Sequence, residues 1–87
     1  MGLDTVEFLL YAEKEFDIKI SDAEAGEIYT LGQFSRLCHA KLLIKPSNTI
    51  DEEQVFTRLT QILHKHFLKT DAAIKREDLI VKDLGLD

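Results

Sequence analysis

The chain has 87 residues, of which 45% are apolar and 31% charged, a balance typical of one small globular domain rather than of a disordered segment. No apolar run approaches the ~20 residues of a membrane-spanning helix, and the first residues lack the basic start and cleavage site of a secretory signal. A single cysteine, Cys38, excludes an internal disulfide, so we expect a cytoplasmic protein in a reducing compartment.

The net charge of −5 is concentrated in the first third of the chain. Residues 1–28 carry eight acidic and two basic side chains, net −6, whereas residues 29–87 have a net charge of +1. An acidic segment argues against nucleic-acid binding, which needs a basic face. It is typical of a solvated helix face, and alternatively of a surface that attracts a partner with a basic patch.

Two helices are predicted in the first third of the chain. The first spans residues 3–16, with Asp4 and Glu7 in capping spacing near its start. A short second helix over residues 22–28 follows the capping box formed by Ser21 and Glu24. The apolar stripe expected on the first helix comprises Leu3, Val6, Leu9, Leu10 and Phe16.

Two further helices are predicted on either side of a proline-containing linker. The third begins at Thr30 and Leu31 and continues to Leu43, and the fourth runs from about Thr49 to Phe67. Residues 44–49 contain the only proline and therefore form the linker between them. The inward residues expected are Leu31, Phe34, either Leu37 or Cys38, and Leu42 on the third helix, and Val55, Leu59, Ile62, Leu63 and Phe67 on the fourth.

The helical periodicity stops after Phe67. Residues 69–78 are polar, and residues 79–86 contain five apolar side chains. This pattern favours a long loop with one short helical turn, because no second strand is available to pair with it. The predicted fold is all-α, a small bundle of three main helices plus one short helix.

The two ends of the chain carry complementary parts of one motif. Residues 83–87 read D-L-G-L-D and residues 3–8 read L-D-T-V-E-F. Read from end to start, they resemble the D-L-G-x-D-S-L-D-x-V-E core of the acyl carrier protein family. Residues 50–87 resemble the first helix and long loop of that family, and residues 1–43 resemble its second to last helices.

The resemblance implies a single carrier-like domain over residues 1–87 whose halves are in circularly permuted order, joined by the linker 44–49. Such rewiring is tolerated where the ends of a small domain lie close together. In one alternative, the C-terminal half completes the N-terminal half of another molecule, forming a domain-swapped dimer. In another, the chain is a segment of two tandem carrier domains.

The family attaches 4′-phosphopantetheine to a serine, and the thiol of this arm carries the acyl group as a thioester. The resemblance puts Gly2, flanked by Asp87 and Leu3, at the position of that serine. Glycine has no hydroxyl group, so no cofactor is expected on the chain as written. Ser21, Ser35 and Ser47 lie outside any D-S-L context and are interpreted as a helix cap, a helix-face residue and a linker residue.

Two sets of site residues follow from the resemblance. The expected partner-docking residues are Asp4, Val6, Glu7, Leu10 and Glu13, and Lys14 occupies a commonly acidic position, which weakens or redirects docking. The candidates for an acyl-chain cavity are Leu9, Leu10, Ile20, Ile28, Leu59, Leu63 and Leu84. Ordinary surface charge and ordinary core packing are the alternatives for the two sets.

The sequence gives little support for a metal site or for nucleophilic catalysis. Cys38, His39, His64 and His66 are metal-ligand types, but they lack C-x-x-C or H-x-x-x-H spacing, so no metal site is expected. Cys38 has no paired base and is interpreted as a buried thiol. No residue is assigned a catalytic role, and the chain is not expected to be an enzyme.

The sequence therefore predicts a scaffold for fatty-acid or polyketide-type acyl carriage that docks acyl-transfer or synthase enzymes through their basic patches. Neither nucleic acid nor a membrane is an expected partner. The alternative is a self-associating helical interaction protein formed by exchange of half-domains.

Overall fold

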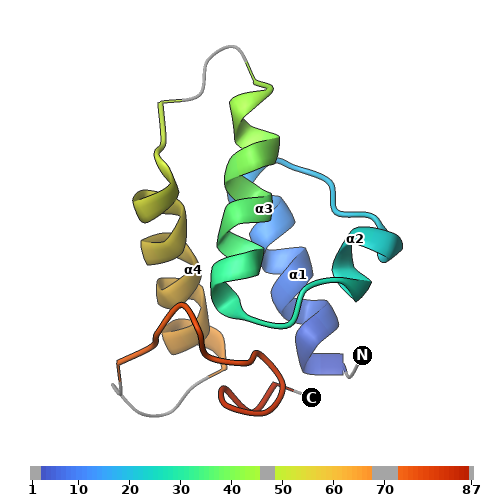
Figure 1. Cartoon of the computed structure of the whole chain (residues 1–87), viewed down its shortest axis with the longest axis vertical. Coiled ribbons are helices and arrows are strands. Elements are labelled where there is room, and N and C mark those ends of the chain that lie inside the picture. Colours follow the sequence, from blue (N-terminus) through green and yellow to red (C-terminus); the bar gives the residue numbers. More distant parts are fainter. Residues whose placement is uncertain (1–2, 46–48, 68–72, 87) are drawn as a thin grey trace.

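The computed structural model describes residues 3–45, 49–67 and 73–86, which contain four helices and no strand (Figure 1). The helices are α1 (Leu3–Phe16), α2 (Asp22–Gly26), α3 (Leu31–Leu43) and α4 (Glu52–His66). The expectation of an all-α bundle with three long helices and one short one is confirmed. None of the helices in the described ranges is long and apolar enough to cross a membrane.

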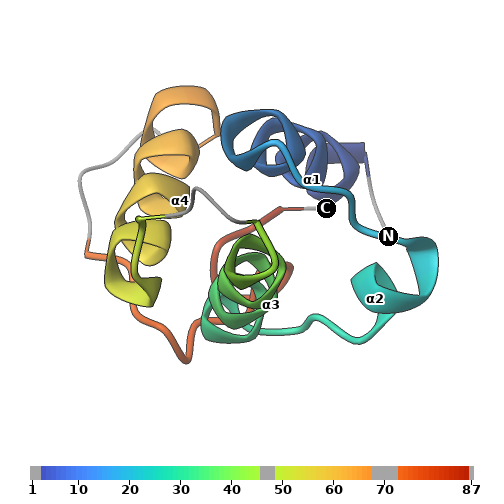
Figure 2. The same cartoon turned by 90° about the horizontal axis from the view of Figure 1, so that it is seen from above.

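The three long helices surround one core. In Figure 1, α1 and α3 run in the same direction and α4 runs back beside them. Seen from above in Figure 2, the short α2 lies to one side of α1 and α3, away from α4. An ion pair of 2.9 Å between Glu24 and Lys41 connects α2 to α3.

Capping side chains define where the later helices begin. Ser21 and Thr30 cap α2 and α3 as predicted, each in a complete capping box. The start of α4 differs from the prediction: the helix begins at Glu52, not near Thr49. The reason is that the Asp51 side chain accepts the Gln54 amide hydrogen and so acts as the N-cap.

The buried side of α1 was predicted only in part: Phe16 is buried and Leu9 is partly buried against the core, as expected, but Val6 and Leu10 are not. Val6 and Leu10 are 40% and 58% exposed, respectively, whereas Phe8 and Ala12 are fully buried. Residues 5, 8, 12 and 16 also recur at helical spacing, and turning this side inward buries the ring of Phe8. The helix is therefore rotated relative to the leucine stripe, which leaves Val6 and Leu10 on the surface.

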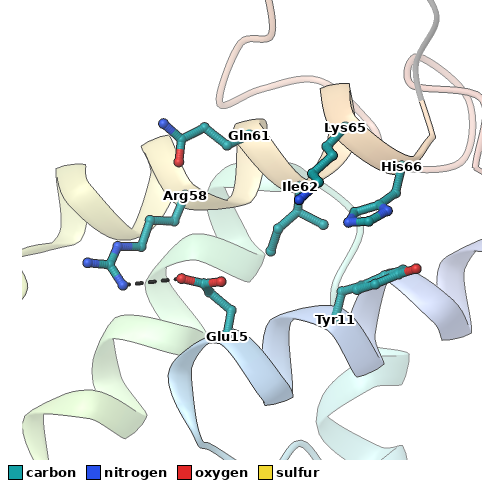
Figure 3. Close-up of a pocket in the computed structure, with 7 residues that line it drawn as sticks. All are labelled: Tyr11, Glu15, Arg58, Gln61, Ile62, Lys65 and His66. Atoms are coloured by element: carbon teal, nitrogen blue, oxygen red, sulfur yellow. Dashed lines mark hydrogen bonds and ion pairs between the residues drawn. The ribbon is translucent and has the colours of Figure 1, made fainter.

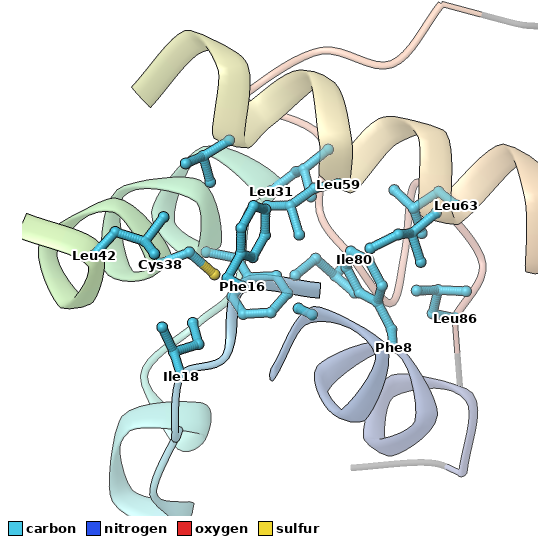
Figure 4. Close-up of a cluster of buried hydrophobic side chains, with 14 residues drawn as sticks. Phe8, Phe16, Ile18, Leu31, Cys38, Leu42, Leu59, Leu63, Ile80 and Leu86 are labelled. Carbon is cyan, nitrogen blue, oxygen red and sulfur yellow. The ribbon is translucent and has the colours of Figure 1, made fainter. Parts of the chain in front are cut away.

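Phe8 lies at the centre of the core (Figure 4). Its ring meets Phe34 of α3 edge-to-face at 5.2 Å and Phe67, just after α4, at 6.0 Å. On α3 the inward residue is Cys38, while Leu37 is only partly buried. The predicted stripe of α4 is confirmed, with Phe67 at its edge; its buried members are Val55, Leu59, Ile62 and Leu63.

The segment 73–86 crosses the end of the bundle where α1 and α3 begin (Figure 1). The Gly32 amide donates to the Arg76 carbonyl at 2.8 Å, and the Ile80 amide donates to the Tyr29 carbonyl at 2.9 Å. A Cβ atom at residue 32 would lie 2.9 Å from that same Arg76 oxygen, so this close approach requires glycine. The predicted helical turn is present, with the Asp83 amide donating to the Leu79 carbonyl.

Candidate functional site

The two halves of the split motif meet at the start of α1. The Thr5 hydroxyl donates to the Leu86 carbonyl at 3.4 Å, across almost the whole length of the chain. Leu86 is only 2% exposed, and Gly85 before it adopts a positive φ of 74°. Gly2 and Asp87 lie outside the described residues, as does the side chain of Leu3. The described parts of the two segments are therefore in contact within one chain.

A small hollow of about 170 Å³ lies next to this junction. Thr5 from α1 and Ile28 from the turn after α2 form part of its wall, and residues 79–82 form much of the rest. Tyr29 and Val81, which also line it, are 65% and 54% exposed. The hollow is mainly apolar and is partly open to solvent.

Four of the five predicted docking residues share the exposed surface of α1. Asp4, Val6, Glu7 and Leu10 are all exposed, and Glu7 and Leu10 border a shallow hollow of about 290 Å³. Glu13 is different, because its carboxylate accepts a hydrogen bond of 2.7 Å from the backbone amide of Ile20. Its role in the structure is therefore to fix the turn that follows α1.

The predicted cavity residues are divided among three environments. Leu59 and Leu63 are fully buried in the core, and Leu10 lies on the surface. The others are partly buried around the core: Leu9, Ile20, Ile28 and Leu84. Ile28 lines both the hollow beside the junction and a second one of about 280 Å³ between α2 and α3. Of the partly buried candidates, Ile28 is therefore one that reaches hollows at the surface.

The serines in the described ranges have structural partners. Ser21 caps α2. Ser35, predicted on a helix face, is instead fully buried, and its hydroxyl donates to the Glu52 carboxylate. Ser47 lies outside the described residues.

Glu52 joins α4 to two other parts of the fold. Besides the hydroxyl of Ser35, its carboxylate accepts a hydrogen bond from Arg76, whose guanidinium lies 4.4 Å from the centre of the Phe56 ring. Partial burial acts to raise the pKa of Glu52, but the hydrogen bonds from Arg76 and Ser35 outweigh it and lower the pKa below its usual value. This cluster therefore has a stabilising role.

Cys38 is buried in the core, and the ring of His66 stacks on Tyr11. Burial raises the pKa of the Cys38 thiol to about 12, so it is protonated at neutral pH and is a poor nucleophile. His66 lies against Tyr11, with ring centres 4.1 Å apart and planes at 15°. Within residues 3–45, 49–67 and 73–86, no three Cys, His, Asp or Glu side chains are grouped to hold a metal ion.

Sequence reasoning missed a groove between α1 and α4, with a volume of about 230 Å³ (Figure 3). The sequence pattern suggests only a metal-ligand role for His66 and none for Tyr11 or Lys65. The available signal was the recurrence of residues 58, 62 and 65 on one side of α4. The side chains around the groove are Tyr11, Glu15, Arg58, Gln61, Ile62, Lys65 and His66.

No family model matches the sequence, and no solved structure matches the chain.

Proposed function

We propose that the chain is a circularly permuted scaffold of the acyl-carrier type that docks enzymes of fatty-acid or polyketide-type acyl transfer and lacks its own arm. The observation that carries the proposal is the hydrogen bond between Thr5 and Leu86. It brings D-L-G-L of the C-terminal segment beside L-D-T-V-E of α1, in the order in which the family motif reads. One chain can therefore supply both halves of a carrier domain.

The exposed surface of α1 supports a docking role. Asp4 and Glu7 supply negative charge, while Val6 and Leu10 present apolar surface beside them. A partner with basic side chains around an apolar contact would complement this surface in both charge and hydrophobicity. Lys14 adds a positive charge on the same helix, which would repel basic side chains of a partner near that end of α1.

The apolar hollow beside the start of α1 supports the proposed acyl-carrier role. Thr5 lies three residues after Gly2 in the sequence, and the hollow that Thr5 borders is lined by Ile28, Leu79 and Ile80. An acyl chain attached near the start of α1 would have apolar surface within reach. We further propose a non-enzymatic role in the cytoplasm, a reducing compartment consistent with the free, buried Cys38.

The test is to restore the missing hydroxyl with Gly2→Ser. Incubation with coenzyme A and a broad-specificity phosphopantetheinyl transferase should add the mass of one phosphopantetheinyl group to this variant and none to the original chain. Gly26→Ser is the matched control, because a side chain at residue 26 meets no atom within 4 Å and the position lies outside the motif.

Modification of Gly2→Ser alone would support the proposal, since transferases recognise the surface around the serine as well as the hydroxyl. A folded Gly2→Ser variant that stays unmodified would contradict the carrier assignment. Modification of the original chain would contradict the assignment of Gly2 and would move the attachment site to another residue, which fragmentation would locate.

A further inference from the structure

We propose that the groove between α1 and α4 binds a small organic anion, a carboxylate or phosphate ester on a short apolar body. This site lies between the second half of α1 and the second half of α4 and does not depend on the proposed carrier role. Figure 3 shows Lys65 and His66 extending from α4 toward α1, with Tyr11 beneath the His66 ring.

Apolar surface lines one part of the groove. Ile62 is only 9% exposed and forms part of the wall between the helices. The stacked rings of Tyr11 and His66 form one end, and Phe67 supports Tyr11 edge-to-face at 5.8 Å. A volume of about 230 Å³ lies below the ~300–1,000 Å³ typical of drug-sized ligands, so the ligand must be small.

The charges around the groove favour an anion. Arg58 is neutralised by Glu15, at an N–O distance of 3.2 Å. Lys65 has no acidic partner within the ranges that the structure describes, so its charge is available to a ligand. The lining therefore has a net positive charge on a protein whose total is −5, and the exposed Lys65 ammonium can pair with an anion that enters the groove.

The polar groups of Tyr11 and His66 also favour an anionic ligand. The Tyr11 hydroxyl and an imidazole N–H of His66 are hydrogen-bond donors, whereas the one carboxylate in the lining already bonds Arg58. An oxyanion can accept hydrogen bonds from these donors together with Lys65. A cationic ligand would instead meet an ammonium group with no free carboxylate nearby.

A second cationic hollow among the described residues is less suitable. It lies at the start of α3, beside Arg36 and Arg76. Backbone amides at a helix start often bind anions, but here the amides of Leu31 and Gly32 already donate to the carbonyls of Asp78 and Arg76. Arg76 is also engaged by Glu52. The groove between α1 and α4 is therefore the better anion site.

The test is a titration of the ¹⁵N-labelled chain with phenyl phosphate, followed by amide chemical shifts. We expect saturable shifts centred on residues 11–15 and 58–66. Inorganic phosphate, which lacks the apolar body, and phenol, which lacks the charge, should each bind more weakly by about tenfold or more.

Lys65→Gln should weaken phenyl phosphate binding by about tenfold, because it removes the unpaired charge and little else. Lys19→Gln is the matched control: it makes the same charge change at an exposed position outside the groove and should leave the affinity unchanged. Equal losses in both variants would overturn the proposal, because binding would then depend only on net charge. No shifts at millimolar phenyl phosphate, or shifts centred elsewhere, would also overturn it.

Discussion

Gly85 sets the direction in which the chain returns to α1. Its φ of 74° lies in the left-handed region, where a Cβ atom comes too close to the following carbonyl oxygen and glycine is therefore preferred. The next residue, Leu86, enters the core and meets Thr5. An added Cβ at residue 85 would contact no other atom within 4 Å, so lack of space does not explain this glycine. Its backbone conformation does.

Gly85→Ala should destabilise the fold by about 1 kcal/mol, since alanine is strained at positive φ. For a domain of this size, the melting temperature should fall by roughly 4–8 °C, measured by circular dichroism. Gly26→Ala is the matched control, because the space there is equally open and φ is not in the left-handed region. It should leave stability unchanged or raise it by up to about 1 kcal/mol. Equal losses in both variants would contradict the role given to φ at Gly85.

At the level of elements, the Glu52 cluster joins α4, α3 and the segment 73–86. Ser35 of α3 and Arg76 of the C-terminal segment both donate to this carboxylate at the start of α4. The folded protein lowers the pKa of Glu52, so the folded state binds the proton less tightly than the unfolded chain does. Glu52 therefore adds stability above its unfolded pKa of about 4.5, and this is lost as the pH falls through the lower folded value.

Glu52→Gln should lower the free energy of unfolding at pH 7 by about 1–2 kcal/mol, through loss of charge-assisted hydrogen bonds. It should also make stability less dependent on pH below about 4.5, where the carboxylate titrates. Urea denaturation between pH 3 and pH 7 measures both effects. Glu53→Gln is the matched control, since it removes the same charge from the same exposed helix start. An unchanged pH profile in Glu52→Gln would contradict the assignment.

Local signals predicted the helices well. The Ser21 capping box and the stripe Val55, Leu59 and Ile62 depend only on neighbouring residues, so their spacing in the sequence reveals them. The Asp51 cap of α4 was missed, because Thr49 and Glu52 have the same capping spacing three residues apart. The buried side of α1 could not be chosen this way, because two sets of positions share helical spacing. The orientation of α1 is set by the packing of Phe8 against Phe34, which is distant in the sequence.

The candidate sites depended on contacts that no local pattern contains. Tyr11 and His66 are 55 positions apart and meet only because α4 runs back along α1. Arg76 and Glu52 likewise lie on different segments, and only the fold brings them into contact. Exposure of the acidic residues Asp4 and Glu7 followed from sequence, whereas the hydrogen bond that occupies Glu13 did not.

At the scale of the whole molecule, one chain completes the bundle. Its radius of gyration is 12.1 Å, which matches the value of about 12 Å expected for a folded chain of this length. The core combines residues from both halves, including Phe8 and Leu31 from the first and Leu59, Leu63 and Ile80 from the second. Exchange of half-domains is therefore an alternative assembly that the core does not require.

Sedimentation velocity at about 10 μM should give a monomer of 10.0 kDa, because a half-domain gains no contacts by exchange that it lacks within its own chain. A dimer would contradict this expectation, and Leu10→Glu would identify its origin. A dimer formed through the exposed surface of α1 should dissociate in that variant, whereas a domain-swapped dimer should persist, since Leu10 lies outside the core.

The Thr5–Leu86 contact also concerns how this domain can be connected to others. Polypeptide attached before α1 and after Leu86 would leave the bundle from neighbouring points. The domain can therefore be inserted into a surface loop of a host protein without forcing the two sides of that loop apart. A protein that receives it in this way keeps its own chain path and acquires the exposed α1 surface as an appendage.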